Sequence, residues 1–140
     1  MNQFNDWVWM EVPMRLATVA QMTVRICGLL LILLGVLLWT GNFDQLKDIH
    51  KLLGIILVLG LWTLALIGAR RGLPLGFVVV AFAWGLVAPI VGLTQEGILT
   101  GGSHWVIQVI HLLIGLGAIG ISERLARMIK GRAPAPAHAA

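Results

Sequence analysis

Four long stretches without any Asp, Glu, Lys or Arg constrain this 140-residue chain more than any other feature. They cover residues 26–40, 52–69, 72–94 and 105–122. A helix needs about 20 apolar residues to cross a bilayer; three stretches come close to that length, and the first is shorter. Charged residues make up only 11% of the chain, whereas soluble domains average about 25%, so a water-exposed surface is excluded. The sequence predicts an all-α, polytopic four-helix bundle embedded in the lipid bilayer.

The expected helix boundaries follow from the residues that flank these stretches. The first helix is extended backward to residue 14, because Pro13 suits the first position of a helix. Residues 1–13 are then an interfacial segment in which Trp7 and Trp9 act as anchors. Residues 131–140 form a disordered tail rich in Ala and Pro. The bundle occupies residues 14–130, with helices expected at about 14–40, 43–69, 73–94 and 104–123.

Positive charges divide unequally between the two ends of the predicted helices. Only Lys47 and Lys51 lie at one end. The other end carries the remaining eight of the ten basic residues, Arg15, Arg25, Arg70, Arg71, Arg124, Arg127, Lys130 and Arg132. Because cytoplasmic loops carry the excess of Lys and Arg, both termini are expected in the cytoplasm. Topology therefore accounts for the net charge of +4, and no nucleic acid is expected as a partner.

Two histidines, His50 and His111, lie within apolar stretches, where an ionisable group is expensive and is a functional candidate by default. Their surroundings match at a constant offset of 61 residues. The matching positions are Gly41, Asn42, Ile49, Leu52 and Gly54 in the first copy and Gly102, Ser103, Ile110, Leu113 and Gly115 in the second. We interpret the match as a duplicated helical hairpin.

The repeat predicts that both imidazoles lie at one depth. Asn42, with Gln45 three residues later, is typical of a capping box, and Ser103 is typical of an N-cap. Each histidine follows its expected cap by eight residues, which is about 12 Å along a helix. The second and fourth helices run in the same direction, so their histidines can hold one planar macrocycle from both faces.

Haem b suits this arrangement, because neutral imidazole is an axial ligand of haem iron. Gly54 and Gly115 follow the histidines by one helical turn and leave room for the ring. The polar residues expected beside the haem propionates lie toward the outer surface on the same two helices: Lys47, His104 and Gln108. One haem b per chain is expected, with His50 and His111 as the iron ligands.

On these two histidine motifs, the chain resembles the small four-helix b-type cytochromes of bacterial membranes, the cytochrome b561-like class. The resemblance covers residues 26–122 and is one of architecture. It implies a multi-pass protein of the bacterial cytoplasmic (inner) membrane that transfers single electrons. Many members of the class hold two haems, whereas only one deep histidine pair is present here. The resemblance implies quinone as a partner, with an external acceptor or a larger membrane redox complex as further candidates.

The residues leave other roles open for the histidine pair. Neutral histidines can form hydrogen bonds between helices, and a chlorophyll-type pigment needs one histidine for each magnesium. Zinc or copper would need more ligands than the sequence offers at this depth. With pigment or no cofactor, the protein would be a non-catalytic accessory subunit of a larger complex. An electron-transfer protein is favoured over an independent oxidoreductase, because no carboxylate lies near the histidines to handle protons.

Overall fold

The computed structural model describes residues 3–132, with side chains described from Val12 onward. Within that range the chain is all-helical and contains no strand. The four long helices are α1 (Gln3–Trp39), α2 (Lys47–Arg70), α3 (Leu75–Thr94) and α4 (His104–Gly131). Three single 3₁₀ turns lie in the loops: η1 (Asp44–Leu46), η2 (Gln95–Gly97) and η3 (Gly101–Ser103). All four long helices have the length and apolar composition of membrane spans, as the sequence predicts.

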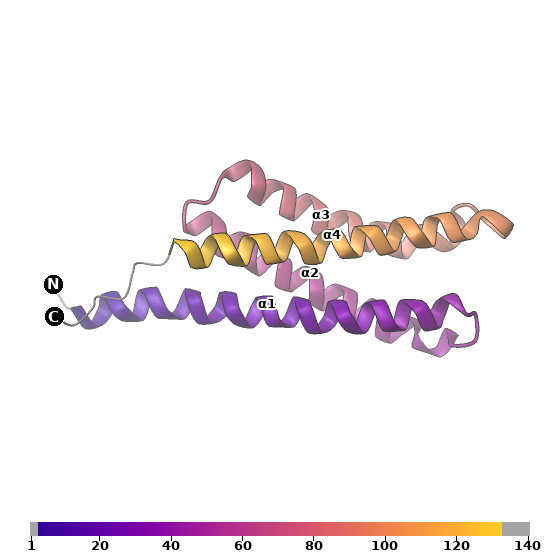
Figure 1. The fold of residues 1–140 in the computed structure, drawn as a ribbon, viewed down its shortest axis with the longest axis horizontal. Coiled ribbons are helices and arrows are strands. Elements are labelled where there is room, and N and C mark those ends of the chain that lie inside the picture. Colours follow the sequence, from indigo (N-terminus) through magenta and orange to yellow (C-terminus); the bar gives the residue numbers. More distant parts are fainter. Residues whose placement is uncertain (1–2, 133–140) are drawn as a thin grey trace.

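The helices alternate in direction, so α1 begins and α4 ends at the same end of the bundle (Figure 1). Helix α1 packs against α2 and α4, and α3 packs against the same two helices. Helices α2 and α4 also contact each other across the bundle, which puts them on its diagonal. The two helices that carry the candidate histidines therefore face each other through the centre.

Helix α1 begins earlier than expected, because it continues upstream of Pro13 to Gln3. Proline at this position removes a single backbone donor, and the helix retains its other hydrogen bonds on both sides. With 37 residues, α1 is about 55 Å long, well beyond the roughly 30 Å of a hydrocarbon core. Helix α4 also ends later than the expected residue 123, and it includes Gly131 of the expected tail. The anchors expected at Trp7 and Trp9 are outside the described side chains, and residues 133–140 are outside the described chain.

The beginnings of α2 and α4 correct the expected caps. Asn42 donates to the carbonyl of Thr40, at 3.2 Å, and does not cap α2, which starts at Lys47. Ser103 precedes α4 but makes no side-chain cap hydrogen bond. A 3₁₀ turn precedes each helix instead, in which Lys47 N–H donates to Asp44 and His104 N–H to Gly101. Backbone carbonyls thus replace the expected side-chain acceptors.

Close packing is concentrated in the half of the bundle that contains the α2–α3 turn. Most buried apolar residues lie in four segments that meet in this half: 17–27, 57–68, 78–81 and 118–129. Glycines allow the helices to approach; a Cβ on Gly60 would lie 2.8 Å from Val24, and one on Gly28 would lie 2.6 Å from Ile119. Small residues commonly serve this purpose in membrane bundles. The other half, which contains the candidate histidines, has few buried residues.

A polar cluster joins α1 to α4 in the closely packed half. The guanidinium of Arg25 donates to both carboxylate oxygens of Glu123, at 2.5 and 2.8 Å. Gln21, which is buried, donates to Glu123 at 2.8 Å and accepts from Lys130 at 2.7 Å. Every polar group named here has a partner, so the cluster fixes the register of α1 against α4.

The end of α4 is tied to the α2–α3 turn. Arg132 donates to the backbone carbonyls of Arg71 and Gly72. Gly72 has a φ of +70°, a left-handed conformation that glycine adopts without a Cβ penalty. The basic residues of α4 and those of the turn therefore share one end of the bundle, opposite Lys47 and Lys51.

Candidate cofactor site

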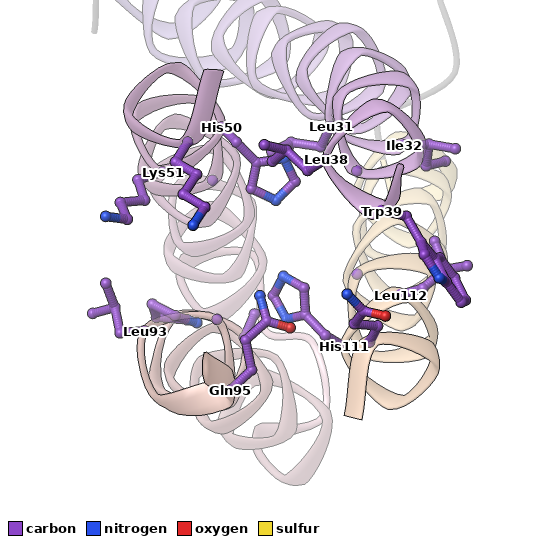
Figure 2. Close-up of a pocket in the computed structure, with 18 of the residues that line it drawn as sticks. Leu31, Ile32, Leu38, Trp39, His50, Lys51, Leu93, Gln95, His111 and Leu112 are labelled. Carbon is purple, nitrogen blue, oxygen red and sulfur yellow. The ribbon is translucent and has the colours of Figure 1, made fainter. Parts of the chain in front are cut away.

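A large cavity lies in the loosely packed half of the bundle. Its volume is about 690 Å³, within the range of about 300–1,000 Å³ that is usual for ligand pockets. All four helices line it (Figure 2). Of the residues that the sequence predicted as site residues, the lining includes all seven: Lys47, His50, Gly54, His104, Gln108, His111 and Gly115.

His50 and His111 face each other across this cavity (Figure 2). Their ring centroids are 6.2 Å apart, and the ring planes are inclined by 50°. His50 is the fourth residue of α2, whereas His111 is the eighth of α4, so the distances from the helix starts are unequal. The two rings nevertheless form a pair across the cavity.

Two glycines that the sequence analysis did not single out lie against the imidazoles. A Cβ on Gly92 of α3 would lie 2.9 Å from Cε1 of His111. A Cβ on Gly35 of α1 would lie 3.7 Å from Cε1 of His50, an ordinary contact distance. Each histidine ring therefore lies against a glycine of a neighbouring helix. In the sequence, these glycines are distinguished only by their position near the outer end of an apolar stretch of bulky residues.

Gly54 and Gly115 have a different role in the cavity. A Cβ on either residue would meet no atom within 4 Å, apart from its own helix backbone and chain neighbours. Both residues line the cavity one turn beyond a histidine. Their missing side chains therefore leave open space beside the gap between the two imidazoles, as the spacing predicts.

The ring nitrogens argue against a purely structural histidine pair. Nδ1 of His50 and Nδ1 of His111 are both buried and have no hydrogen-bond partner among the residues that the structure describes. A histidine that serves as an interhelical hydrogen-bonding group should be satisfied, because an unpaired buried polar atom costs about 1–3 kcal/mol. The burial of Nδ1 makes Nε2 the candidate ligand nitrogen of each ring.

Polar side chains gather where the cavity opens at the ends of the helices. Lys47 forms ion pairs with Asp44, at 3.1 Å, and with Glu96, at 3.0 Å. The lysine expected beside propionates is therefore already engaged by two carboxylates of the chain. Nδ1 of His104 lies 3.2 Å from the carbonyl oxygen of Ile98. Further polar residues of the lining are Lys51, Gln95 and Gln108.

The separation of the two histidines matches a pair of ligands on one central ion. A metal–imidazole bond is about 2.0–2.1 Å, and the ring centroid is about 1.1 Å beyond the nitrogen, so opposite ligands have centroids about 6.3 Å apart. The observed separation is 6.2 Å. Within residues 3–132 no group of three or more His, Cys, Asp or Glu could hold a bare metal ion. The donor set thus suits an ion that brings its own equatorial ligands in a planar macrocycle.

Comparison with known proteins gives no further guide to this site. No protein-family model, curated protein sequence or solved structure matches the chain.

Proposed function

We propose that the protein is a membrane b-type cytochrome that holds one haem b between His50 and His111. The observation that carries the proposal is the pair of imidazoles facing each other at 6.2 Å across a cavity lined by four helices. Two axial imidazoles are a recognised ligand set for electron-transfer haem proteins.

The roles of the chain's own residues follow from their positions. Nε2 of each histidine would bind the iron, because Nδ1 is the buried nitrogen of each ring. Gly92 and Gly35 leave room for the His111 and His50 rings beside α3 and α1. Apolar residues form most of the cavity wall, and His104, Gln108 and Lys51 can accompany the charged propionates at its polar end.

With both axial positions filled by protein, a bound haem supplies one-electron transfer and no open site for oxygen. The ring separation also favours haem over a chlorophyll-type pigment. One pigment per histidine would require two macrocycles, whereas the space between the rings suits one central ion.

The charge distribution supports an orientation for this cytochrome. Eight of the ten basic residues lie toward the closely packed end, so we assign that end and both termini to the cytoplasmic face of a bacterial inner membrane. The cavity then opens toward the outer face. Membrane quinone, an external electron acceptor and a larger redox complex remain the proposed partners. We attribute the matching histidine helices to duplication of a hairpin.

Optical spectra of histidine variants test the proposal. The protein purified in detergent should show a low-spin b-type spectrum on reduction, with one haem per chain by pyridine extraction. His50→Ala and His111→Ala should each abolish the low-spin spectrum. His104→Ala should retain it, with at most a shifted midpoint potential.

Matched controls are the preceding residues, Ile49→Ala and Ile110→Ala, which are exposed on the bundle surface and outside the cavity lining. Both controls should retain the wild-type spectrum and haem content. An unchanged spectrum in His111→Ala would overturn the ligand assignment. A folded wild-type protein that cannot take up haem would overturn the cytochrome proposal itself.

A further inference from the structure

Gln95 has a buried polar atom without a hydrogen-bond partner in the described part of the chain, in the same cavity lining as His111. The residue follows the last residue of α3 and opens η2. Its Oε1 atom is buried and has no hydrogen-bond partner among the described residues, and the same is true of Nδ1 of His111. An amide oxygen is an acceptor, and Nδ1 of a neutral imidazole can be a donor. The two unsatisfied atoms are therefore chemically complementary.

The backbone places these two groups on the same wall of the cavity. The His111 ring lies against Gly92, so this face of α3 is the one directed at the imidazole. Gln95 is three residues further on, about one turn later on the same face. Figure 2 shows the Gln95 side chain extending into the cavity beside the His111 ring, and both residues line the cavity.

We propose that Gln95 is a positioning residue that accepts a hydrogen bond from Nδ1–H of His111. This bond would fix the tautomer in which Nε2 is unprotonated and available as a ligand. Histidines that bind metals almost always donate their other ring N–H to such an acceptor. The inference rests on the proposed function and goes beyond it, because it assigns a role to a residue that follows α3, a helix that carries no ligand.

The proposal gives a hydrogen-bond acceptor to Nδ1 of His111 but none to Nδ1 of His50. The 61-residue offset that pairs His50 with His111 pairs Gln95 with Leu34, which cannot accept a hydrogen bond. Nδ1 of His50 is also without a partner, and no equivalent side chain is available from the repeat. Hydrogen bonding to one imidazole raises its basicity, so the α4 ligand is the stronger electron donor.

Substitutions at Gln95 test this through the reduction potential. Gln95→Leu removes the acceptor and should raise the midpoint potential, whereas Gln95→Glu supplies a stronger acceptor and should lower it. We expect at least a tenfold difference between these variants in the ratio of reduced to oxidised protein at fixed potential, about 59 mV for one electron. Thr94→Val, a neighbouring exposed position outside the cavity lining, should leave the potential unchanged.

Nitrogen-15 NMR of histidine-labelled, cofactor-free protein provides a readout that does not depend on haem. His111, assigned by comparison with His111→Ala, should carry its proton on Nδ1 in the wild type and in Gln95→Glu. It should shift toward the Nε2–H tautomer in Gln95→Leu. A wild-type His111 protonated on Nε2, or a tautomer unchanged in Gln95→Leu, would overturn the role of Gln95.

The two experiments separate this inference from the proposed function. Haem binding with equal potentials in all Gln95 variants would refute the positioning role and leave the cytochrome intact. Failure of the wild type to bind haem, together with an Nδ1–H tautomer that depends on Gln95, would refute the cytochrome and leave the hydrogen bond. If Gln95→Leu does not fold, the wild-type tautomer and the potential of Gln95→Glu decide the question.

Discussion

Adding one methyl group behind His111 should weaken haem binding. In Gly92→Ala the new Cβ would lie 2.9 Å from Cε1 of His111. Carbon atoms in contact are normally about 3.5–4.0 Å apart, so the ring must retreat by about 0.6 Å or more. Functional groups in a binding site need placement to within about 0.5 Å. The displaced imidazole would therefore no longer sit where its partner across the cavity requires it.

The size of the effect follows from the cost of overpacking. Such substitutions cost about 1–3 kcal/mol. Without the cofactor the ring can swing into the cavity, so the cost appears mainly when haem fixes it. At about 1.4 kcal/mol for each factor of ten, we expect haem affinity to fall by about 5- to 150-fold.

Titration of haem into cofactor-free protein, followed by Soret absorbance, measures this affinity. Gly35→Ala is the matched control, because its Cβ would lie 3.7 Å from Cε1 of His50, an ordinary contact. Both variants exchange a helical glycine for alanine, so helix propensity changes equally. The reasoning is refuted if the two variants bind haem equally well, or if Gly35→Ala is the more damaged.

Three further predictions concern the cavity, the polar cluster and the topology. Gly115→Leu fills open space in the cavity and should abolish haem uptake while the bundle stays folded. In the same titration, Gly120→Leu should bind haem normally, because its Cβ also has open space but lies outside the cavity lining. Gln21→Leu removes buried hydrogen bonds to a carboxylate and an ammonium of α4 and should lower the free energy of unfolding by about 1–3 kcal/mol. Denaturant unfolding in detergent checks this against the exposed neighbour Met22→Leu, which should be near neutral; equal losses would show that the cluster contributes nothing. Gly97→Cys, in a chain whose single native cysteine is replaced by serine, should react with an impermeant maleimide from outside intact cells, and labelling only after lysis would reverse the orientation.

The apolar stretches and the histidine repeat were enough to predict the general architecture. Uncharged runs of bilayer length leave few alternatives to spanning helices, and the structure has four of them. The offset between His50 and His111 pointed to rings at one depth, and the two rings face each other. Both features depend on long or repeated patterns, which a sequence displays directly.

Local details were harder to predict, because different groups can accept hydrogen bonds from the backbone N–H groups at a helix start. Asn42 and Ser103 have the residue types of helix caps, yet 3₁₀ turns supply carbonyl acceptors in their place. Pro13 suits a helix start, yet α1 continues upstream of it, although an interior proline loses one hydrogen bond and crowds the carbonyl four residues earlier.

Residues that act from neighbouring helices were not predictable from spacing at all. Gly92 lies in α3 and Gln95 directly follows it. The apolar stretch of α3 has no ionisable residue, so the sequence identifies this helix only as scaffold. Their relation to His111 depends on which face of α3 turns toward α4. That rotation is set by packing in the other half of the bundle, where small residues such as Gly85 accept bulky neighbours.

Packing density divides the bundle into a closed half and an open half, and the candidate site lies in the open half. The closed half holds α1 to α4 through the Gln21 cluster and small residues. In the open half, His50 and His111 face each other across a cavity of about 690 Å³. A rigid base of this kind can keep two ligands on different helices at a fixed separation, which axial coordination from both faces requires.

Near-infrared magnetic circular dichroism of the ferric protein in detergent tests the central claim most directly, because it identifies the pair of axial ligands on a low-spin haem. If His50 and His111 hold the haem, the wild type shows a bis-imidazole signature from one haem per chain, and both His50→Ala and His111→Ala lose it. A high-spin haem, a ligand pair other than two imidazoles, or a signature that survives either substitution would contradict it.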